Sequence, residues 1–490
     1  MVVKKIEQGL VKGKEVDGVY SFFGIPYAKL PARWAPPAAP EPWEGVHDGL
    51  RFGNAAIQTV HNVKLKAEES EDCLNLNVWS GDVDVDANLP VMVWIHGGGF
   101  INWSSSMDEW NGAELSKNKV VVVSMNYRLG PLGFIYHPEA GCNFAVLDWV
   151  ASLTWVSRNI KQFGGNPDNV TIFGQSAGAT AVRALLCTPS AHGLFHKALL
   201  ISAGFDNYTH VESPSLDRVK HYSDKFFDHL GTHDLAALQQ LPINDMKNDF
   251  KLFAGIRPQM DQLYTPANLI WCPVQDNKIV HSIETCPKHI PVIFGYTDNE
   301  ARFFIRPQGI YGQPKIEDVS KVYNAKTLSA TASLLGGQNA DQIVRQVANL
   351  PPYEALDQLL TNAIWKEPAL KSFHTFASLS IPSYMYCFAR ISPANQTSGE
   401  LASHCCDLPY LFGHVTTGEK YDDTDVHVSE ALRYAVTAFT YTGVPRFTND
   451  EPWSKVDPTH PRITILADTI RDEKLIIDPL TKCINPAINL

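Results

Sequence analysis

Short apolar runs that alternate with amphipathic stretches constrain the fold of this chain more than any other feature of its sequence. Three runs rich in β-branched residues are typical of buried strands, at 90–96, 120–125 and 170–173. Between the last two, apolar residues recur at every third or fourth position over 144–160, which predicts an amphipathic helix. Strands that alternate with helices predict an α/β fold with a large, mostly parallel, twisted central sheet and helices on both faces.

The rest of the chain extends this pattern without an obvious domain boundary. Further strands are predicted at 198–201, 291–294 and 383–388, and further helices at 177–186 and 428–441. No Gly/Ser-rich linker, low-complexity segment or internal repeat divides the 490 residues. We therefore expect one domain over 1–490, with a helical excursion at about 213–270. This excursion would cover the carboxyl edge of the sheet, where open α/β sheets bind ligands.

Charge, hydropathy and cysteine usage narrow the class of protein. The net charge of −11 provides no basic stripe for nucleic acid, and no apolar run reaches the roughly 18 residues that would span a membrane. The nine cysteines are scattered without CxxC pairs, so we expect neither a disulfide framework nor a metal site. No signal-peptide h-region follows Met1, which favours a cytoplasmic protein, or a secreted one whose signal was removed.

The most specific local motif is Gly-Gln-Ser-Ala-Gly at 174–178, between a predicted strand and a predicted helix. This G-x-S-x-G pattern is typical of a nucleophile elbow, in which a serine is held on a strained turn and only small neighbours fit. In such an elbow the backbone N–H of the next residue, here Ala177, is aimed at a substrate oxyanion. A purely structural turn is the alternative reading of the pentapeptide.

A second motif, His-Gly-Gly-Gly-Phe at 96–100, follows another predicted strand. Consecutive glycines allow several backbone N–H groups to approach one developing negative charge. A plain flexible loop is the alternative. A phosphate-binding loop is rejected, because Phe100 and Ile101 stand where a Lys-Ser/Thr pair would be needed.

These residues belong to a longer series of motifs that resembles the type-B carboxylesterase and cholinesterase family of α/β-hydrolases. The chain is particularly similar to microbial p-nitrobenzyl-esterase-like members. The likeness begins early, persists more weakly to about Arg446, and rests on ordered motifs at 24–28 (GIPYA), 71–77 (EDCLNLN), 96–100, 126–130 (NYRLG), 163–167 (FGGNP) and 174–178.

The resemblance implies a catalytic triad in the order serine, acid, histidine. It makes Ser176 the nucleophile, and the segment HCCDLPYLFG at 404–413 is similar to the one that begins with the family's catalytic His404. The segment IFGYTDNE at 293–300 is similar to the one that carries the acid, which falls on Glu300, with Asp298 as the rival. The resemblance further implies an oxyanion hole formed by Gly98, Gly99 and Ala177, and a supporting role at most for the buried Ser202.

The chain also departs from the family pattern. Gln175 stands where many members have a glutamate, and Cys405 and Ala301 replace the glycines after the histidine and the acid. Cys73 lacks the cysteine near Ala56 with which the family forms a disulfide, which favours a reducing compartment. The loop at 57–72 contains no tryptophan to hold a quaternary ammonium by cation–π attraction, so a choline ester is not the expected substrate.

The expected activity is therefore that of a serine carboxylesterase, which acts through an acyl-enzyme and needs no cofactor. An acyl transferase or lactone-forming enzyme would use the same triad, and a non-catalytic binding protein could share the fold. The expected partner is a small-molecule ester, and the expected state is a monomer or weak homodimer. Candidate pocket residues are Phe100, Gln175 and Phe205, with ordinary core packing as the alternative. Two arginines, Arg183 and Arg302, could meet an acidic substrate or simply be solvated.

Overall fold

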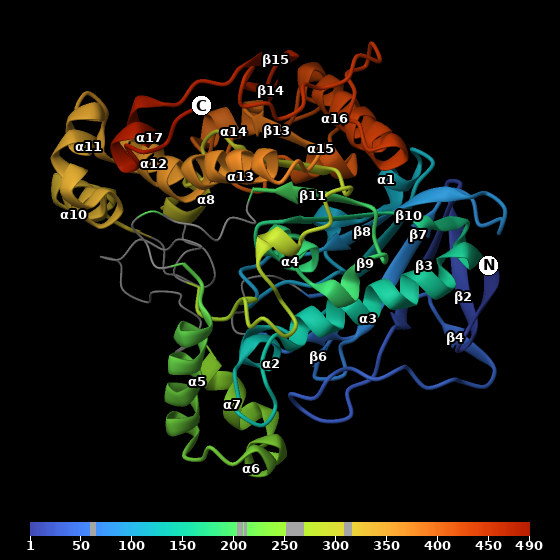
Figure 1. Ribbon diagram of the computed structural model, residues 1–490. Coiled ribbons are helices and arrows are strands. Elements are labelled where there is room, and N and C mark those ends of the chain that lie inside the picture. The colour runs from blue at the N-terminus through green and yellow to red at the C-terminus, as the bar shows by residue number, and fades with distance from the viewer. Residues whose placement is uncertain (59–64, 203–208, 210–212, 251–268, 308–315) are drawn as a thin grey trace.

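A computed structural model of the protein describes residues 1–58, 65–202, 209, 213–250, 269–307 and 316–490. Its framework is a 13-stranded sheet (Figure 1). In spatial order the strands are β1 (Val2–Ile6), β2 (Gly9–Val16), β3 (Val19–Pro26), β7 (Asn75–Ser80), β9 (Val121–Met125), β8 (Leu89–Ile95), β10 (Gly165–Gln175), β11 (Lys197–Ile201), β12 (Val292–Thr297), β13 (Ser383–Phe388), β14 (Arg462–Leu466) and β15 (Ile470–Lys474). The short β4 (Val46–Asp48) pairs with β2, and β5 (Ala55–Ala56) pairs with β6 (Glu69–Ser70) outside this sheet.

The centre of the sheet is parallel and both edges are antiparallel. In spatial order, the strands from β9 to β14 run parallel to one another. The strands β1, β2, β3 and β7 at one edge of the sheet, and β15 at the other, join it in antiparallel pairs. The predicted strands coincide with the parallel centre. There the side chains are buried on both faces, which makes each strand a continuous apolar run.

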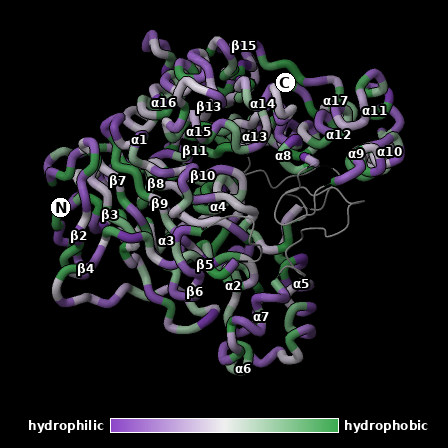
Figure 2. The backbone as a smooth tube through the Cα atoms, turned by 180° about the vertical axis from the view of Figure 1, so that it is seen from behind, coloured by the Kyte–Doolittle hydropathy of each residue, from purple (hydrophilic) through white to green (hydrophobic). Residues whose placement is uncertain are grey.

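The side chains of β8 show how the sheet divides the core into two layers. Val93 and Ile95 face one hydrophobic cluster together with α3 (Phe144–Asn159) and α4 (Ala177–Leu186). The alternate residue Trp94 faces a second cluster on the opposite side, where α15 (Leu408–Phe412) and α16 (Asp423–Thr442) pack. Figure 2 shows hydrophobic residues gathered along these central strands. The sheet is therefore covered by helices on both faces, as the sequence predicts.

Helix ends follow local signals in the sequence. The helix predicted over 144–160 is α3, which continues as a 3₁₀ turn to Phe163 and stops at Gly164, where φ is +81°. The predicted helix at 428–441 is α16, which starts earlier because Asp422 and Asp425 form a reciprocal capping box. The remaining helices are α1 (Ala113–Ser116), α2 (Gly130–Phe134), α8 (Arg302–Ile305), α9 (Val319–Val322), α10 (Ala325–Gly336), α11 (Ala340–Gln346), α12 (Pro352–Thr361), α13 (Glu367–Ser378), α14 (Pro393–Ser398) and α17 (Pro479–Ile484), besides three in the excursion.

The helical excursion expected at about 213–270 contains α5 (Leu216–Leu230), α6 (Leu235–Gln240) and α7 (Ile243–Phe250), which project together from the body in Figure 1. Residues 251–268 lie outside the described part. Arg33 binds the C-terminal end of α6, because its Nη1 donates to the carbonyl oxygens of Leu238 and Leu241, both at 2.9 Å. The division of the chain into a single domain with one excursion stays a prediction.

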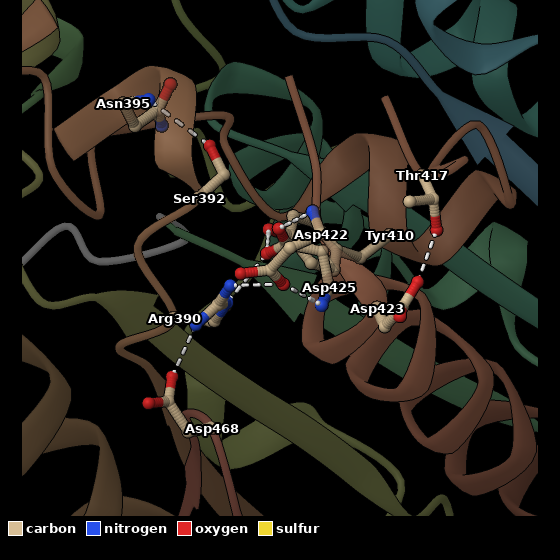
Figure 3. A network of polar contacts seen from close by, with 9 residues as sticks. All are labelled: Arg390, Ser392, Asn395, Tyr410, Thr417, Asp422, Asp423, Asp425 and Asp468. Carbon is tan, nitrogen blue, oxygen red and sulfur yellow. Dashed lines mark hydrogen bonds and ion pairs between the residues drawn. The ribbon is translucent and has the colours of Figure 1, made fainter. Parts of the chain in front are cut away.

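A buried arginine lies at the centre of a polar network that joins four segments of the chain (Figure 3). Arg390, just after β13, donates to Asp425 at 2.6 Å and to Asp422 and Asp468 at 2.7 Å each. Tyr410 of α15 donates to the same carboxylate of Asp425 at 2.5 Å. The network thus joins the end of β13, the start of α16, the turn before β15 and the helix that follows His404.

Substitution of Arg390 by methionine is expected to lower the free energy of unfolding by about 3–5 kcal/mol. The change would leave the fully buried carboxylate of Asp425 without its cation. The matched control is Arg471→Met in β15, whose ion pair with Glu473 is about half exposed and should contribute less than about 1 kcal/mol. Urea unfolding followed by tryptophan fluorescence measures both variants. Equal midpoints for the two would contradict the structural role of Arg390.

Within the described residues, no helix is long and apolar enough to cross a membrane.

Candidate active site

Ser176 lies on a strained turn between the last residue of β10 and the first residue of α4. Its φ of 57° and ψ of −126° fall in a region that residues other than glycine rarely adopt. A Cβ atom on Gly174 would lie 2.4 Å from the backbone of Gly178, and one on Gly178 would lie 2.0 Å from the carbonyl oxygen of Ile95. The two glycines of the motif are therefore required by close packing of the turn against β8.

The predicted acid and base meet in the structure. Glu300 lies in the turn after β12, where its Oε1 accepts a hydrogen bond of 2.8 Å from the backbone N–H of Thr297. Its Oε2 forms a short contact with Nδ1 of His404, and both side chains are buried. The imidazole packs against three aromatic rings whose centroids lie 5.0–5.7 Å away, those of Phe303, Phe304 and Trp365.

The rival acid, Asp298, faces elsewhere. Its side chain is 48% exposed and forms an ion pair of 2.9 Å with Lys366, which lies on the π-helical turn Asn362–Lys366. The geometry thus brings Glu300, and not Asp298, to the imidazole of His404.

The other ring nitrogen of His404 is occupied by Gln175. The side-chain Nε2 of Gln175 lies 3.0 Å from Nε2 of His404. In the described structure no hydrogen bond joins Ser176 Oγ to His404, although Ser176 is the next residue after Gln175. Serine and base are therefore brought to the same site without being hydrogen-bonded to each other.

The glycine loop lies against the elbow. A Cβ atom on Gly97 would stand 3.3 Å from Cβ of Ser176 and 2.7 Å from the carbonyl oxygen of Gln175. Gly98 and Gly99 have φ values of 95° and 63°, which glycine adopts without strain. Gly99 and Ala177 border the same cavity as Ser176, while Gly98 is absent from its lining.

His96 at the start of this loop is a structural residue. Burial lowers the pKa of its imidazole to about 4, and its Nδ1 lies 2.9 Å from the carbonyl oxygen of Gly97. It therefore stays neutral at ordinary pH and takes no part in the pairing of Glu300 and His404.

Comparison with known proteins assigns this arrangement to a family. Residues 2–475 match the family model described as the carboxylesterase family. The para-nitrobenzyl esterase of Bacillus subtilis (strain 168) is 33% identical over 469 residues, which cover 90% of this chain and 89% of that protein. The chain belongs to the carboxylesterase family. It is accordingly a carboxylic-ester hydrolase.

Other relatives and solved structures agree with this assignment. The phenmedipham hydrolase of Pseudarthrobacter oxydans is 29% identical over 92% of each chain. A PNB esterase structure has a TM-score of 0.81 at 29% identity over 98% of each chain. The Geobacillus stearothermophilus carboxylesterase also has a TM-score of 0.81, at 27% identity over 100% of each chain. The predicted α/β-hydrolase fold and the predicted family are both confirmed.

The cavity of this carboxylesterase opens beside Ser176 and has a volume of about 360 Å³. Phe100 lines it as predicted, whereas Gln175 lies outside its lining and Phe205 falls outside the described residues. Of the two arginines, Arg183 of α4 borders the cavity, and Arg302 is instead paired with Asp357 at 2.8 Å.

Several cavity residues escaped the sequence analysis because they come from segments far from any motif. Phe304, Ile364 and Trp365 line one side. Pro214, just before α5, and Leu269, which follows the undescribed residues 251–268, also line the cavity. Apolar residues in such segments give no signal that distinguishes a pocket wall from ordinary core.

A second buried carboxyl group, that of Asp407, lies within reach of the charge of Glu300. Burial, and then the charge of Glu300, raise the pKa of Asp407 to about 7. Cys405 and Cys406 lie nearby and are half-buried, and desolvation of their thiols raises the pKa of each well above its usual range. Both thiols therefore stay protonated at neutral pH.

Among the described residues, no group of three or more histidine, cysteine or carboxylate side chains is placed to hold a metal ion.

Proposed function

We propose that the protein hydrolyses carboxylic esters with a Ser176–His404–Glu300 triad, through an acyl-enzyme intermediate. The observation that carries the proposal is the buried pair of Glu300 and His404 beside a strained serine that borders a cavity. A serine hydroxyl is a weak nucleophile by itself, and an adjacent base oriented by a carboxylate is the arrangement that activates it.

In the acylation step, Ser176 Oγ attacks the ester carbonyl while Nε2 of His404 accepts its proton. The carbonyl electron pair moves onto oxygen, where the N–H groups of Gly98, Gly99 and Ala177 stabilise it, each typically by about 3–4 kcal/mol. The imidazolium then protonates the leaving alcohol as the C–O bond breaks. Water repeats the sequence on the acyl-enzyme and releases the acid. Glu300 holds Nδ1 and stabilises the imidazolium throughout.

The cavity supports a substrate of modest size. Its volume of about 360 Å³ lies at the small end of ligand pockets, and its lining combines apolar residues such as Phe100 and Phe304 with polar groups. The similarity to a para-nitrobenzyl esterase and a phenmedipham hydrolase adds para-nitrobenzyl esters and phenmedipham as candidate substrates. We propose small esters with one apolar group beside the reacting carbon.

Labelling with a fluorophosphonate tests the proposed nucleophile directly. One equivalent of reagent is expected to add to the peptide that contains Ser176, because the strained hydroxyl next to a base attacks phosphorus as it attacks carbon. Intact-mass and peptide mass spectrometry measure the adduct, and p-nitrophenyl butyrate should protect against it. Addition at a different residue, with ester turnover retained, would contradict the proposal.

A turnover assay separates hydrolysis from acyl transfer. Turnover of p-nitrophenyl butyrate is followed with and without added alcohol, and the acyl products are separated by chromatography. Free butyrate as the main product supports hydrolysis, whereas an ester of the added alcohol would assign a transferase.

A further inference from the structure

The side chain of Gln175 lies deep in the site, between the elbow and the base. The residue is fully buried at the end of β10. Its Nε2 lies 3.0 Å from Nε2 of His404, the nitrogen that must accept the proton of Ser176 in the proposed mechanism. Glu300 occupies Nδ1 on the other side of the ring. The two neighbours of the imidazole therefore have different chemistry, one an anionic acceptor and the other a neutral amide.

The chemistry of these groups fixes the tautomer that fits. A carboxylate can only accept a hydrogen bond, so Nδ1 of His404 carries the hydrogen that faces Glu300. An amide nitrogen can only donate, so Nε2 of His404 must present its lone pair to Gln175. The pair of contacts matches neutral imidazole with the basic lone pair on Nε2. A protonated ring would set an N–H of His404 against an N–H of Gln175.

The surroundings of the amide favour this orientation. Burial raises the pKa of Cys405, and a hydrogen bond with Gln175 acts in the opposite direction, as expected if the amide N–H₂ is the donor. The amide Oε1 is buried without a hydrogen-bond partner. It lies on the side of Gly97, where a Cβ atom would stand 3.3 Å from it. Turning the amide over would place this oxygen against the lone pair of Nε2.

We propose that Gln175 is a positioning residue for the base, and that its amide holds His404 in the neutral, proton-accepting tautomer. The proposal rests on the proposed function, since it assigns the role of base to His404. The hydrogen bond is lost when the imidazole is protonated, so it extends the activity of the enzyme toward acidic pH. Ser176 and Gln175 share one acceptor, and the amide occupies it in the absence of substrate.

Other groups near His404 could also shape a pH profile. Glu300 is the anion in contact, and Asp407 is a second buried carboxyl whose pKa is raised to about 7 by burial and by Glu300. The positive charge of Arg306 reaches the site, where it acts to lower the pKa of Cys405. From α8 and the π-helical turn, three aromatic side chains pack against the ring. Burial also raises the pKa values of the nearby Cys405, Cys406 and Tyr386, which keeps these groups neutral.

The test is the pH dependence of kcat/KM for p-nitrophenyl acetate, measured on Gln175→Glu and Gln175→Met. A carboxylate within hydrogen-bond distance of Nε2 favours imidazolium, so Gln175→Glu is expected to move the acidic limb upward by at least about one pH unit. Gln175→Met has a similar volume and only removes the donor. Its acidic limb should move upward by roughly half a unit to one unit, the equivalent of one ordinary hydrogen bond.

Two control variants identify the origin of any shift. Gln342→Glu adds the same charge on the exposed surface of α11 and should leave the profile unchanged. Asp407→Asn removes the second buried carboxyl group near His404, and the pH profile of this variant should retain the acidic limb. If that limb disappears in Asp407→Asn, it belongs to Asp407 and the role of Gln175 is overturned.

A profile of Gln175→Met that coincides with that of the native enzyme would overturn the proposal, whether or not Gln175→Glu folds. The proposed function is tested separately, by turnover of Ser176→Ala. Turnover that persists in Ser176→Ala rejects the triad itself. Turnover that is lost there, combined with unshifted Gln175 profiles, rejects only the role of Gln175.

Discussion

Replacement of Ser176 by alanine is expected to lower kcat for p-nitrophenyl esters by a factor on the order of 10⁵–10⁶. The variant would keep the glycine loop and the pair of Glu300 and His404, but no atom would remain to form the acyl-enzyme. Ser176 Oγ makes no hydrogen bond with His404 and alanine is smaller than serine, so the fold should be unaffected. Initial rates with esters from acetyl to octanoyl measure the loss, and the native profile gives the size of the acyl pocket.

The matched control for this variant is Ser202→Ala. Ser202 follows β11 with a φ of 54°, and its buried hydroxyl has no hydrogen-bond partner in the described structure. Its backbone carbonyl, which accepts a hydrogen bond of 3.1 Å from Trp365, is unaffected by the change. Activity should therefore stay within about tenfold of the native value, the effect of a residue outside the acyl-transfer unit. Comparable losses in both serine variants would contradict the assignment of the nucleophile.

The parts of the fold that could be predicted from the sequence are those in which one local pattern decides the structure. The parallel strands around Ser176 are buried on both faces, so their apolar runs are continuous. The edge strand β1 alternates exposed and half-buried positions and includes Lys4 and Lys5, so it lacks this signal. Its partner β2 is likewise largely polar, and no local pattern in the sequence specifies the antiparallel pairing of this edge.

The residues of the site also differ in whether a local pattern in the sequence predicts them. Ser176 and the glycine loop are encoded by compact motifs whose glycines are required by backbone contacts shorter than a Cβ atom allows. Glu300 and His404 were found by resemblance alone, and the structure brings them into contact across 104 positions of sequence. The contact of Gln175 with His404 spans 229 positions. Such contacts depend on how β10, β12 and the segment before α15 are placed by the sheet, which no local pattern specifies.

Substitution of Glu300 by glutamine is expected to lower kcat by about 10⁴-fold, the effect of reversing the tautomer of a catalytic histidine. An amide in place of the carboxylate can donate an N–H to Nδ1 of His404, which would move the ring hydrogen to Nε2. The lone pair that accepts the serine proton would then be lost. The new N–H on Nε2 would also face the amide N–H of Gln175, so the ring would lose its hydrogen bond on that side.

The rival acid provides the matched control. Asp298→Asn makes the same chemical change two positions away, but it weakens only the ion pair between the half-exposed Asp298 and Lys366, which does not include His404. Its kcat should stay within a few-fold of the native value. Pre-steady-state release of p-nitrophenol shows where the loss occurs, because a wrong tautomer slows acylation and abolishes the burst. A burst that survives in Glu300→Gln and vanishes in Asp298→Asn would transfer the role of the acid to Asp298.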